Sequence, residues 1–440
     1  MALKQSIDAL VVGAGPVGLV AALALARAGN RHVEIIDEAE RKTGLSYAMA
    51  LHPATLDALA ELGIAAPLLA GGNRVDRIAL YDGATRKAEL VLRALDRAHP
   101  FVLVVPQSEL EGVLLNALAD AGVEVRWRHR LRRLEVGDRS DRGSATAVAC
   151  TIDRIDSDSS GYAVAKVGGV VGKTFEREIP LVIGADGYDS LVRRQLGIEQ
   201  RATGPSGTVA VFELEGESLP SDLPGSDARR ELRITFSGGL RSVWWPLPGD
   251  RSRLGFELPA DEEATTPRGK SRLPSIVPWL APTLDEGRLQ ELVRERLPWH
   301  ASPSGRLMWS AAVRFERALA DSFGRGRVWL AGDAAHLAFP FGVQSMNVGI
   351  VEAKELATRG ARVLDGKEPY ASLAVHGGER RERWRALVAS SGAGEEAAAA
   401  GAIDGDPWLT ANRSRIVEAL PVSPGEPEQL FARVASKNSA

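Results

Sequence analysis

A glycine-rich motif near the start of the chain has the spacing with which main-chain loops bind phosphate groups. It follows the apolar run 9–12 and precedes a helix of small residues expected over 19–28. Such a turn brings main-chain N–H groups and the positive end of a helix to an anion. The predicted pyrophosphate contacts are Gly13, Gly15, Pro16, Val17 and Gly18. The motif therefore indicates dinucleotide binding.

An acidic residue stands where the ribose of such a dinucleotide needs a hydrogen-bond acceptor. Asp37 ends the next apolar run, 33–36, and Glu38 beside it is a second candidate. Glycine repeats alone also occur in turns that bind nothing. Here strand, helix, second strand and terminal acid follow in the order of a doubly wound nucleotide-binding fold, so the pattern predicts that fold.

Two later apolar runs each end in an aspartate. Asp186 follows the run 181–185, and Asp333 follows the run 328–331 and Gly332. An acid at the carboxyl end of a parallel strand faces the ligand crevice. Each aspartate also has a structural alternative, because aspartate is a common helix cap. Together with the glycine motif, these acids predict a bound FAD, with Asp333 accepting hydrogen bonds from the ribityl chain.

Taken together, the motifs resemble the single-component flavoprotein aromatic hydroxylases, the para-hydroxybenzoate hydroxylase-like monooxygenases, over about residues 8–366. The residues that carry the resemblance are 13–18, 184–187 with Ser190 and Arg193, and 327–336 with Pro340, Gly342, Asn347 and Gly349. The resemblance implies FAD, NADH or NADPH as a transient electron donor, and dioxygen. A flavin hydroperoxide would insert one oxygen atom into an aromatic or polyketide-like small molecule.

The resemblance also implies further flavin contacts. They are Gln107, Gly332, Pro340, Gly342, Ser345, Met346 and Asn347. The helix that begins near Asn347 would direct its positive end at the flavin and favour the anionic reduced state. The sequence departs from the family pattern at Val343 and Ser345, where the family often has glycine, and at Glu352, where it often has aspartate. Val343 and Ser345 would add bulk beside the flavin ring.

Candidate substrate contacts come from aromatic and polar side chains. Trp244 and Trp245, followed by Pro246, could form an aromatic wall, although core packing is an equal alternative for the tryptophans, and Phe341 is a further pocket candidate. The resemblance places the Pro340 carbonyl near the substrate. Tyr47, which stands where the family often has arginine, and His52 are candidates for acid, base or orienting groups.

The order of the elements predicts an α/β fold with intertwined domains. A Rossmann-like FAD domain of the glutathione-reductase type is expected over 1–76, 101–205 and 318–366. A mainly antiparallel substrate domain is expected over 77–100 and 206–317, and a C-terminal helical segment over 367–440, with a flexible linker near 392–405. A second dinucleotide motif is absent from the sequence, so the nicotinamide cofactor is expected to bind transiently.

Composition narrows the functional class. The chain has 440 residues, a net charge of −3 and scattered basic residues, which disfavours nucleic-acid binding. A single cysteine excludes an internal disulfide, the 7 histidines lack metal-ligand spacing, and no apolar stretch is long enough for a bilayer. We therefore expect a cytoplasmic protein without a metal, whose oligomeric state the sequence leaves open.

Three other functions are compatible with the FAD motifs. A flavin-dependent dehydrogenase or reductase would never transfer oxygen to substrate. A flavin-dependent halogenase is disfavoured, because Trp244-Trp245-Pro246 does not match the W-x-W-x-I-P pattern of that class. A non-catalytic flavin-binding scaffold would bind FAD without oxidising a nicotinamide cofactor.

Overall fold

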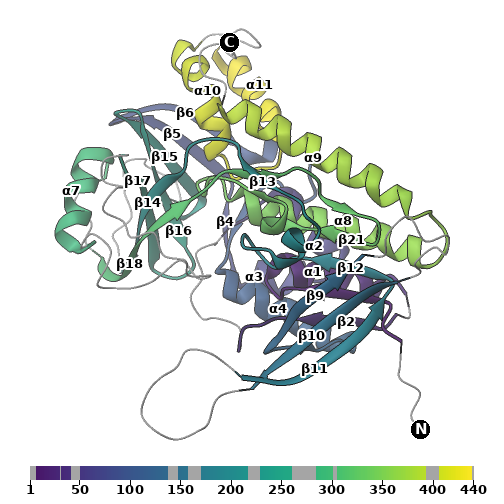
Figure 1. The fold of residues 1–440 in the computed structure, drawn as a ribbon. Coiled ribbons are helices and arrows are strands. Elements are labelled where there is room, and N and C mark those ends of the chain that lie inside the picture. The colour runs from purple at the N-terminus through teal and green to yellow at the C-terminus, as the bar shows by residue number, and fades with distance from the viewer. Residues whose placement is uncertain are drawn as a thin grey trace, which may run out of the picture.

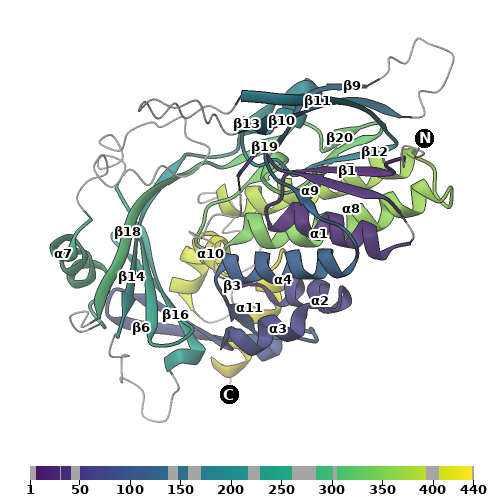
Figure 2. The ribbon, with the colours of Figure 1, turned by 90° about the horizontal axis from the view of Figure 1, so that it is seen from below.

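The computed structural model describes residues 6–29, 31–40, 50–136, 147–156, 170–216, 228–259, 284–300, 305–392 and 406–438. It confirms a mixed α/β fold, in which two large sheets lie on either side of a helical layer (Figures 1 and 2). Tyr47 and most of the predicted linker near 392–405 lie outside the described residues.

The first large sheet carries the three motifs. Its order is β20-β21-β12-β1-β2-β8, and all neighbouring strands are parallel except β20 and β21. The strands are β1 (Ala9–Val12), β2 (Val33–Ile36), β8 (Val125–Arg126), β12 (Leu181–Gly184), β20 (Gly324–Arg325) and β21 (Val328–Leu330). Strands β1, β12 and β21 are buried along their whole length, which is why they occur as uninterrupted apolar runs.

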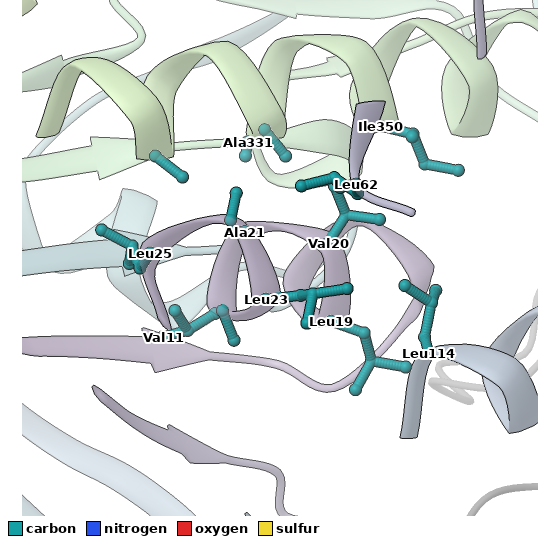
Figure 3. Close-up of a cluster of buried hydrophobic side chains, with 14 of the residues drawn as sticks. Val11, Leu19, Val20, Ala21, Leu23, Leu25, Leu62, Leu114, Ala331 and Ile350 are labelled. Carbon is teal, nitrogen blue, oxygen red and sulfur yellow. The ribbon is translucent and has the colours of Figure 1, made fainter. Parts of the chain in front are cut away.

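Helix α1 (Pro16–Arg27) forms the centre of the adjoining helical layer. It packs against α4 (Gln107–Asp120) and α8 (Gln344–Leu364). Figure 3 shows Leu19 and Leu23 of α1 within this core, with Leu114 of α4 and Ile350 of α8 beside the helix. A helix buried on all sides needs the small, apolar residues that the sequence places here.

The second large sheet has the order β18-β14-β17-β16-β15-β5-β6. Its strands are β5 (Arg77–Asp82), β6 (Thr85–Val91), β14 (Gly207–Glu215), β15 (Glu231–Ser237), β16 (Leu240–Leu247), β17 (Arg251–Glu257) and β18 (Arg306–Phe315). The pairs are antiparallel except β15 with β5. The hairpin β5–β6 thus shares one sheet with strands that follow more than a hundred residues later. This membership supports the domain division expected from the sequence, which stays a prediction.

Helices cover both faces of the second sheet. Helix α7 (Glu286–Arg296) packs on its outer face. The C-terminal part folds into α9 (Ala371–Gly392), α10 (Pro407–Ala419) and α11 (Glu426–Asn438). Figure 2 shows α10 and α11 on the concave inner side of the sheet, where Leu409 and Ile416 join its apolar core.

Smaller elements complete the fold. The three-stranded sheets are β9 (His129–Glu135), β10 (Val148–Asp156) and β11 (Val170–Ile179); β13 (Gln200–Ala202), β19 (Ala318–Ala320) and β22 (His336–Leu337); and β3 (Ala50–Leu51), β4 (Asn73–Val75) and β7 (Val102–Val104). The short helices are α2 (Pro53–Glu61), α3 (Ala65–Gly71), α5 (Leu191–Gln195) and the 3-10 turns η1 (Leu92–Ala94), η2 (Ala228–Arg230) and η3 (Gly332–Ala334). None of the described helices combines the length and apolar character needed to cross a bilayer.

Candidate active site

The glycine motif forms a tight turn between β1 and α1. Gly13 has a φ of +103°, and a Cβ at this position would stand 2.2 Å from the main-chain oxygen of Ala185. A Cβ on Gly18 would stand 2.0 Å from the main-chain oxygen of Gly13. These two glycines are therefore required by packing, whether or not a ligand binds.

Gly15 differs from the other two glycines of the motif. Apart from its immediate neighbours along the chain and the backbone of its own helix, no atom of the described residues lies within 4 Å of the position of its Cβ. Gly15 is the N-cap of α1 and is followed by Pro16, and no side chain in the described part of the protein caps the helix there. The first N–H groups of α1 thus keep their hydrogen-bonding capacity beside open space, an arrangement that fits a pyrophosphate.

Asp37 braces the glycine turn from the end of β2. Its Oδ2 accepts a hydrogen bond from the Ala14 N–H at 2.7 Å, and its Oδ1 accepts one from the Ala39 N–H at 2.8 Å. Each carboxylate oxygen can accept a second bond, so a ribose hydroxyl remains compatible with this geometry. Glu38 beside it is exposed. The bracing contact was not predicted from the sequence.

The Asp186 side chain supports the start of helix α5, whose N-cap is Ser190. Its Oδ1 accepts a hydrogen bond from the Ser190 hydroxyl at 2.6 Å, and its Oδ2 accepts one from the Val192 N–H at 3.1 Å. Ser190 in turn accepts a bond from the Arg193 N–H at 2.9 Å. Burial raises the Asp186 pKa, although these hydrogen bonds act in the opposite direction. For Asp186 the geometry therefore favours the structural alternative, helix capping.

Asp333 is placed differently. It lies in η3 and is exposed, and no described residue donates a hydrogen bond to its carboxyl. Protein nevertheless surrounds the carboxyl closely enough for desolvation to raise its pKa, against a lowering effect of His336. An acceptor that is desolvated but unpartnered fits a role in binding hydroxyl donors of a ligand.

The three motifs converge in space. The turn at Gly13 lies against Ala185, and a Cβ on Gly332 would come within 3.0 Å of the Val17 side chain. Arg193 links the middle and late motifs, because its guanidinium donates to the Tyr188 oxygen at 2.8 Å and to the Ala334 oxygen at 2.9 Å. The sequence indicated Arg193 only as part of a motif and did not predict this link.

A buried cluster explains one departure from the family pattern. His336 forms a hydrogen bond through Nε2 with Glu352 at 2.7 Å, and Trp384 of α9 donates to the same carboxyl at 2.9 Å. The rings of His336 and Trp384 stack with their centroids 3.8 Å apart. Glu352 thus joins the late motif to the C-terminal part of the chain.

The loop before α8 is fixed from behind by Asn347. Its Oδ1 accepts a hydrogen bond from the His52 N–H at 2.8 Å, and its Nδ2 donates to the oxygens of Ala50 and Val343, each at 2.9 Å. Asn347 is fully buried. Val343, the N-cap of α8, adopts the left-handed conformation with a φ of 51°, which is unfavourable for a β-branched residue.

His52 holds the same loop through a main-chain oxygen. Its Nε2 forms a 2.7 Å hydrogen bond with the Gly342 oxygen, and the side chain is fully buried. Burial lowers the His52 pKa to about 3, so the imidazole is neutral and donates through Nε2. This contact places His52 behind the loop, where its side chain supports the main chain.

The other predicted cofactor contacts lie around the same loop and at the start of α4. Ser345 accepts a hydrogen bond at Oγ from the Ala338 N–H at 2.8 Å. Pro340 and Met346 are half-buried. Gln107, the first residue of α4, is half-buried and donates to Glu111 at 2.6 Å.

The aromatic wall needs a correction. Trp244 and Trp245 are adjacent in β16 and face opposite sides of the sheet. Trp244 packs in the outer cluster under α7, with the Arg233 guanidinium 6.0 Å from its ring centroid. Trp245 lies in the inner cluster with Phe341, whose ring comes within 3.6 Å of the Cβ position on Gly255. Only Trp245 and Phe341 therefore share a face.

One inner-face tryptophan was not predicted from the sequence. Trp309 of β18 is half-buried, and its Nε1 donates to Glu213 at 3.2 Å. The Arg253 guanidinium lies 5.0 Å from the Trp309 ring centroid and donates to Glu213 at 2.7 Å. The described residues contain no group of three or more side chains suited to hold a metal ion.

Comparison with known proteins identifies the family. A family profile described as an FAD binding domain matches residues 6–391. The chain belongs to this FAD binding domain family. Membership fits the glycine turn, the uncapped start of α1 and the unpartnered Asp333 carboxyl.

Individual relatives of this FAD binding domain protein are monooxygenases. 6-Methylpretetramide 4-monooxygenase of Streptomyces rimosus is 29% identical over 378 residues, 84% of this chain but 58% of that protein. Rifampicin monooxygenase of Rhodococcus hoagii is 26% identical over 383 residues, 85% of this chain and 68% of that protein. The chain thus spans less than two thirds of the first of these relatives.

A solved structure shares the fold along the whole chain. p-Nitrophenol 4-monooxygenase PnpA from Pseudomonas putida DLL-E4 aligns with a TM-score of 0.70 at 20% identity, covering 99% of this chain and 98% of that chain. Together with the family match and the relatives, this likeness confirms the resemblance to flavoprotein hydroxylases and FAD as the cofactor.

Proposed function

We propose that the protein is an FAD-dependent monooxygenase that uses NADH or NADPH and dioxygen to insert one oxygen atom into an aromatic or polyketide-like small molecule. The observation that carries the proposal is the convergence of the three motifs at an uncapped helix start and an unpartnered aspartate. The relatives, named as monooxygenases of 6-methylpretetramide and of rifampicin, support the reaction class.

Each motif has a role in holding the cofactor. The N–H groups at Gly15 and the first turn of α1 bind the pyrophosphate, and Asp37 accepts from the ribose. Asp333 accepts from the ribityl hydroxyls. The 340–343 loop and the first turn of α8 would hold the isoalloxazine ring, with Pro340, Ser345 and Met346 among the contacts. The positive end of α8 then stabilises negative charge on the reduced ring.

Bound FAD supplies the redox chemistry, accepting hydride from the nicotinamide cofactor and activating dioxygen. The chain supplies orientation and a dry environment. The inner face of the second sheet is apolar around Trp245 and Phe341, and these residues are 2% and 4% exposed. Helices α10 and α11 pack against this face, so Trp245 and Phe341 belong to an apolar core that keeps water away from the proposed flavin site. Trp309, half-buried on the same face, extends it toward polar groups of a substrate.

A flavin-dependent dehydrogenase or reductase is the second candidate. Val343 favours it, because a valine side chain stands at a position where the resembling hydroxylases often have glycine. In this alternative the substrate loses hydride to FAD and gains no oxygen. The residues that bind FAD would be the same, so the fate of oxygen separates the two functions.

Isotope labelling tests the proposal. The FAD-loaded protein is reduced anaerobically with NADH or NADPH, then mixed with labelled dioxygen and a panel of aromatic and polyketide-like compounds. We expect a product that carries one labelled oxygen atom, with the second appearing in water. Unlabelled products that have lost two hydrogens to the oxidised, FAD-loaded protein, in the absence of NADH and NADPH, would instead identify the dehydrogenase.

A further inference from the structure

Gln344 connects the start of α8 to the C-terminal segment (residues 406–438). Its Nε2 donates to the main-chain oxygens of Leu420 at 2.9 Å and Val422 at 2.8 Å. Gln344 is 4% exposed. Leu420 is the C-cap of α10, so Gln344 satisfies carbonyl groups where that helix ends.

The same segment fills the space beside Gly342. A Cβ on Gly342 would stand 2.6 Å from the Glu418 oxygen and 2.9 Å from the Leu420 oxygen. Real side chains do not tolerate such distances to main-chain atoms. The 340–343 loop therefore packs directly against the backbone at the end of α10, and only glycine fits at position 342.

A buried ionic cluster anchors this end of α10. Glu418 pairs with Arg241, and with Arg317 at 2.7 Å. Arg241 also makes two hydrogen bonds to Glu257, each at 2.9 Å. Removing one member of a buried pair leaves an uncompensated charge, so the position of α10 is strongly specified.

The anchor reaches the aromatic rings on either side of Pro340. The Arg241 guanidinium lies 4.7 Å from the Phe339 ring centroid and 5.4 Å from that of Phe341. The Arg317 guanidinium also lies 4.9 Å from the Phe339 ring centroid. Through Arg241, the ionic cluster thus contacts both Phe341 of the 340–343 loop and Glu418 at the end of α10.

The conformation of Val343 requires such support. A left-handed β-branched residue persists only where its surroundings over-determine it. His52 and Asn347 hold the loop through the oxygens of Gly342 and Val343. Gln344, the next residue of the chain, contacts the end of α10.

We propose that Gln344 is a positioning residue through which the C-terminal segment fixes the 340–343 loop and the first turn of α8 in register with the isoalloxazine ring. This inference rests on the proposed binding of FAD beside that loop. The C-terminal segment is then part of the active site, although it carries none of the three FAD motifs. Loss of the two contacts releases the positive end of α8 and lowers the flavin midpoint potential.

The test compares two glutamines in the full chain. Gln344→Met keeps the volume of the side chain and removes its donors. Gln195→Met is the matched control, because Gln195 bridges main-chain groups elsewhere, donating to the Arg132 oxygen at 2.8 Å and accepting from the Leu134 N–H. Hydrogen exchange of the peptide covering 340–348 is measured without FAD, and the flavin spectrum and midpoint potential are measured with it.

We expect Gln344→Met to raise exchange in that peptide about tenfold and to shift the potential downward, with Gln195→Met unchanged in both. Glu418→Gln, which weakens the anchor on the other side of the contact, should produce the same two changes to a smaller extent. Unchanged exchange and an unchanged potential in Gln344→Met would overturn the proposal. If Gln344→Met fails to fold, the same two readouts on Glu418→Gln decide.

The test of Gln344 can fail or succeed independently of the oxygen-labelling experiment. A protein that never transfers oxygen yet shows both changes retains the positioning function of Gln344 and loses the monooxygenase assignment. A protein that oxygenates its substrate, but in which neither variant changes exchange or potential, retains the activity and loses the positioning function.

Discussion

Gly349, in the second turn of α8, lies directly on the backbone of Gly332. A Cβ on Gly349 would come within 3.0 Å of the Gly332 Cα and 3.1 Å of the Val17 side chain. Glycine at both positions allows α8 to approach the late motif and the start of α1 at the same point. The N-terminal turns of two helices are thereby brought beside Asp333, which concentrates positive potential where an anionic cofactor is proposed to bind.

The glycine turn predicts two different mutant phenotypes. Gly13→Ala should destabilise the FAD-free protein by at least about 2 kcal/mol, because of its φ and the clash with Ala185. Gly15→Ala should leave that stability within about 0.5 kcal/mol and weaken FAD binding about tenfold, since its Cβ would meet only the pyrophosphate. Denaturant unfolding and FAD titration measure the two effects. Equal FAD affinity for Gly15→Ala and wild type would place the pyrophosphate elsewhere.

The two motif aspartates should respond in opposite ways to substitution, because only Asp186 accepts hydrogen bonds from described residues. The raised pKa of Asp333 means that its charged form is disfavoured in the folded protein, and this cost is present once the pH exceeds the raised value. Asp333→Asn should therefore stabilise the FAD-free protein at neutral pH while weakening FAD binding. Asp186→Ala should destabilise it by about 1–2 kcal/mol, because the acceptor for both the Ser190 hydroxyl and the Val192 N–H is lost. Thermal unfolding with and without FAD distinguishes the two variants.

Alanine variants are usually more stable than glycine variants inside a helix, and the left-handed conformation of Val343 should reverse this order at its position. At Val343, the glycine variant should be more stable than the alanine variant by about 1 kcal/mol, because alanine retains the left-handed penalty. At Val351, in the interior of α8, alanine should be the more stable by about 1 kcal/mol. Urea unfolding of the four variants tests the reversal. The same order at both positions would show that Val343 is not left-handed in solution.

His52 predicts a loss of stability in acid. Its pKa is 6.5 in an ordinary environment and about 3 in the folded protein, so below pH 6.5 the unfolded chain binds a proton that the folded chain does not. Stability should fall by up to about 1.4 kcal/mol per pH unit through this window. His52→Gln retains a donor for the Gly342 oxygen and lacks the titration. The advantage of the wild type over this variant should shrink between about pH 7.5 and about pH 5; a constant difference would argue against a buried, neutral His52.

The sequence was sufficient to bring the FAD motifs together, because each one follows an uninterrupted apolar strand. Parallel strands expose their carboxyl ends at one edge, so Gly13, Asp186 and Asp333 had to meet there. The distinction between the two aspartates could not be predicted. It depends on whether nearby donors, such as Ser190 and the Val192 N–H, already occupy the carboxyl.

The sequence already contained the information that places Trp244 and Trp245 on opposite faces of the sheet. Trp244 and Trp245 are consecutive in a strand, and strand alternation alone excludes a single wall made of both. The same alternation places Val211 and Glu213 of β14 on one face of the sheet. Trp309 of the neighbouring strand β18 pairs with Glu213 and therefore lies on that face too. By contrast, Gln344 contacts Leu420 and Val422, which lie 76 and 78 positions further along the chain, and no local sequence pattern predicts such contacts.

Helices α10 and α11 are synthesised after the sheet that they cover, and this order affects folding during translation. The strands of the second sheet leave the ribosome before Leu409, Ile416 and Leu430, which cover their inner face. In the interval, Trp245 and Phe341 remain open to water and to neighbouring chains. We therefore expect a chain truncated before α10 to expose this apolar face and to aggregate.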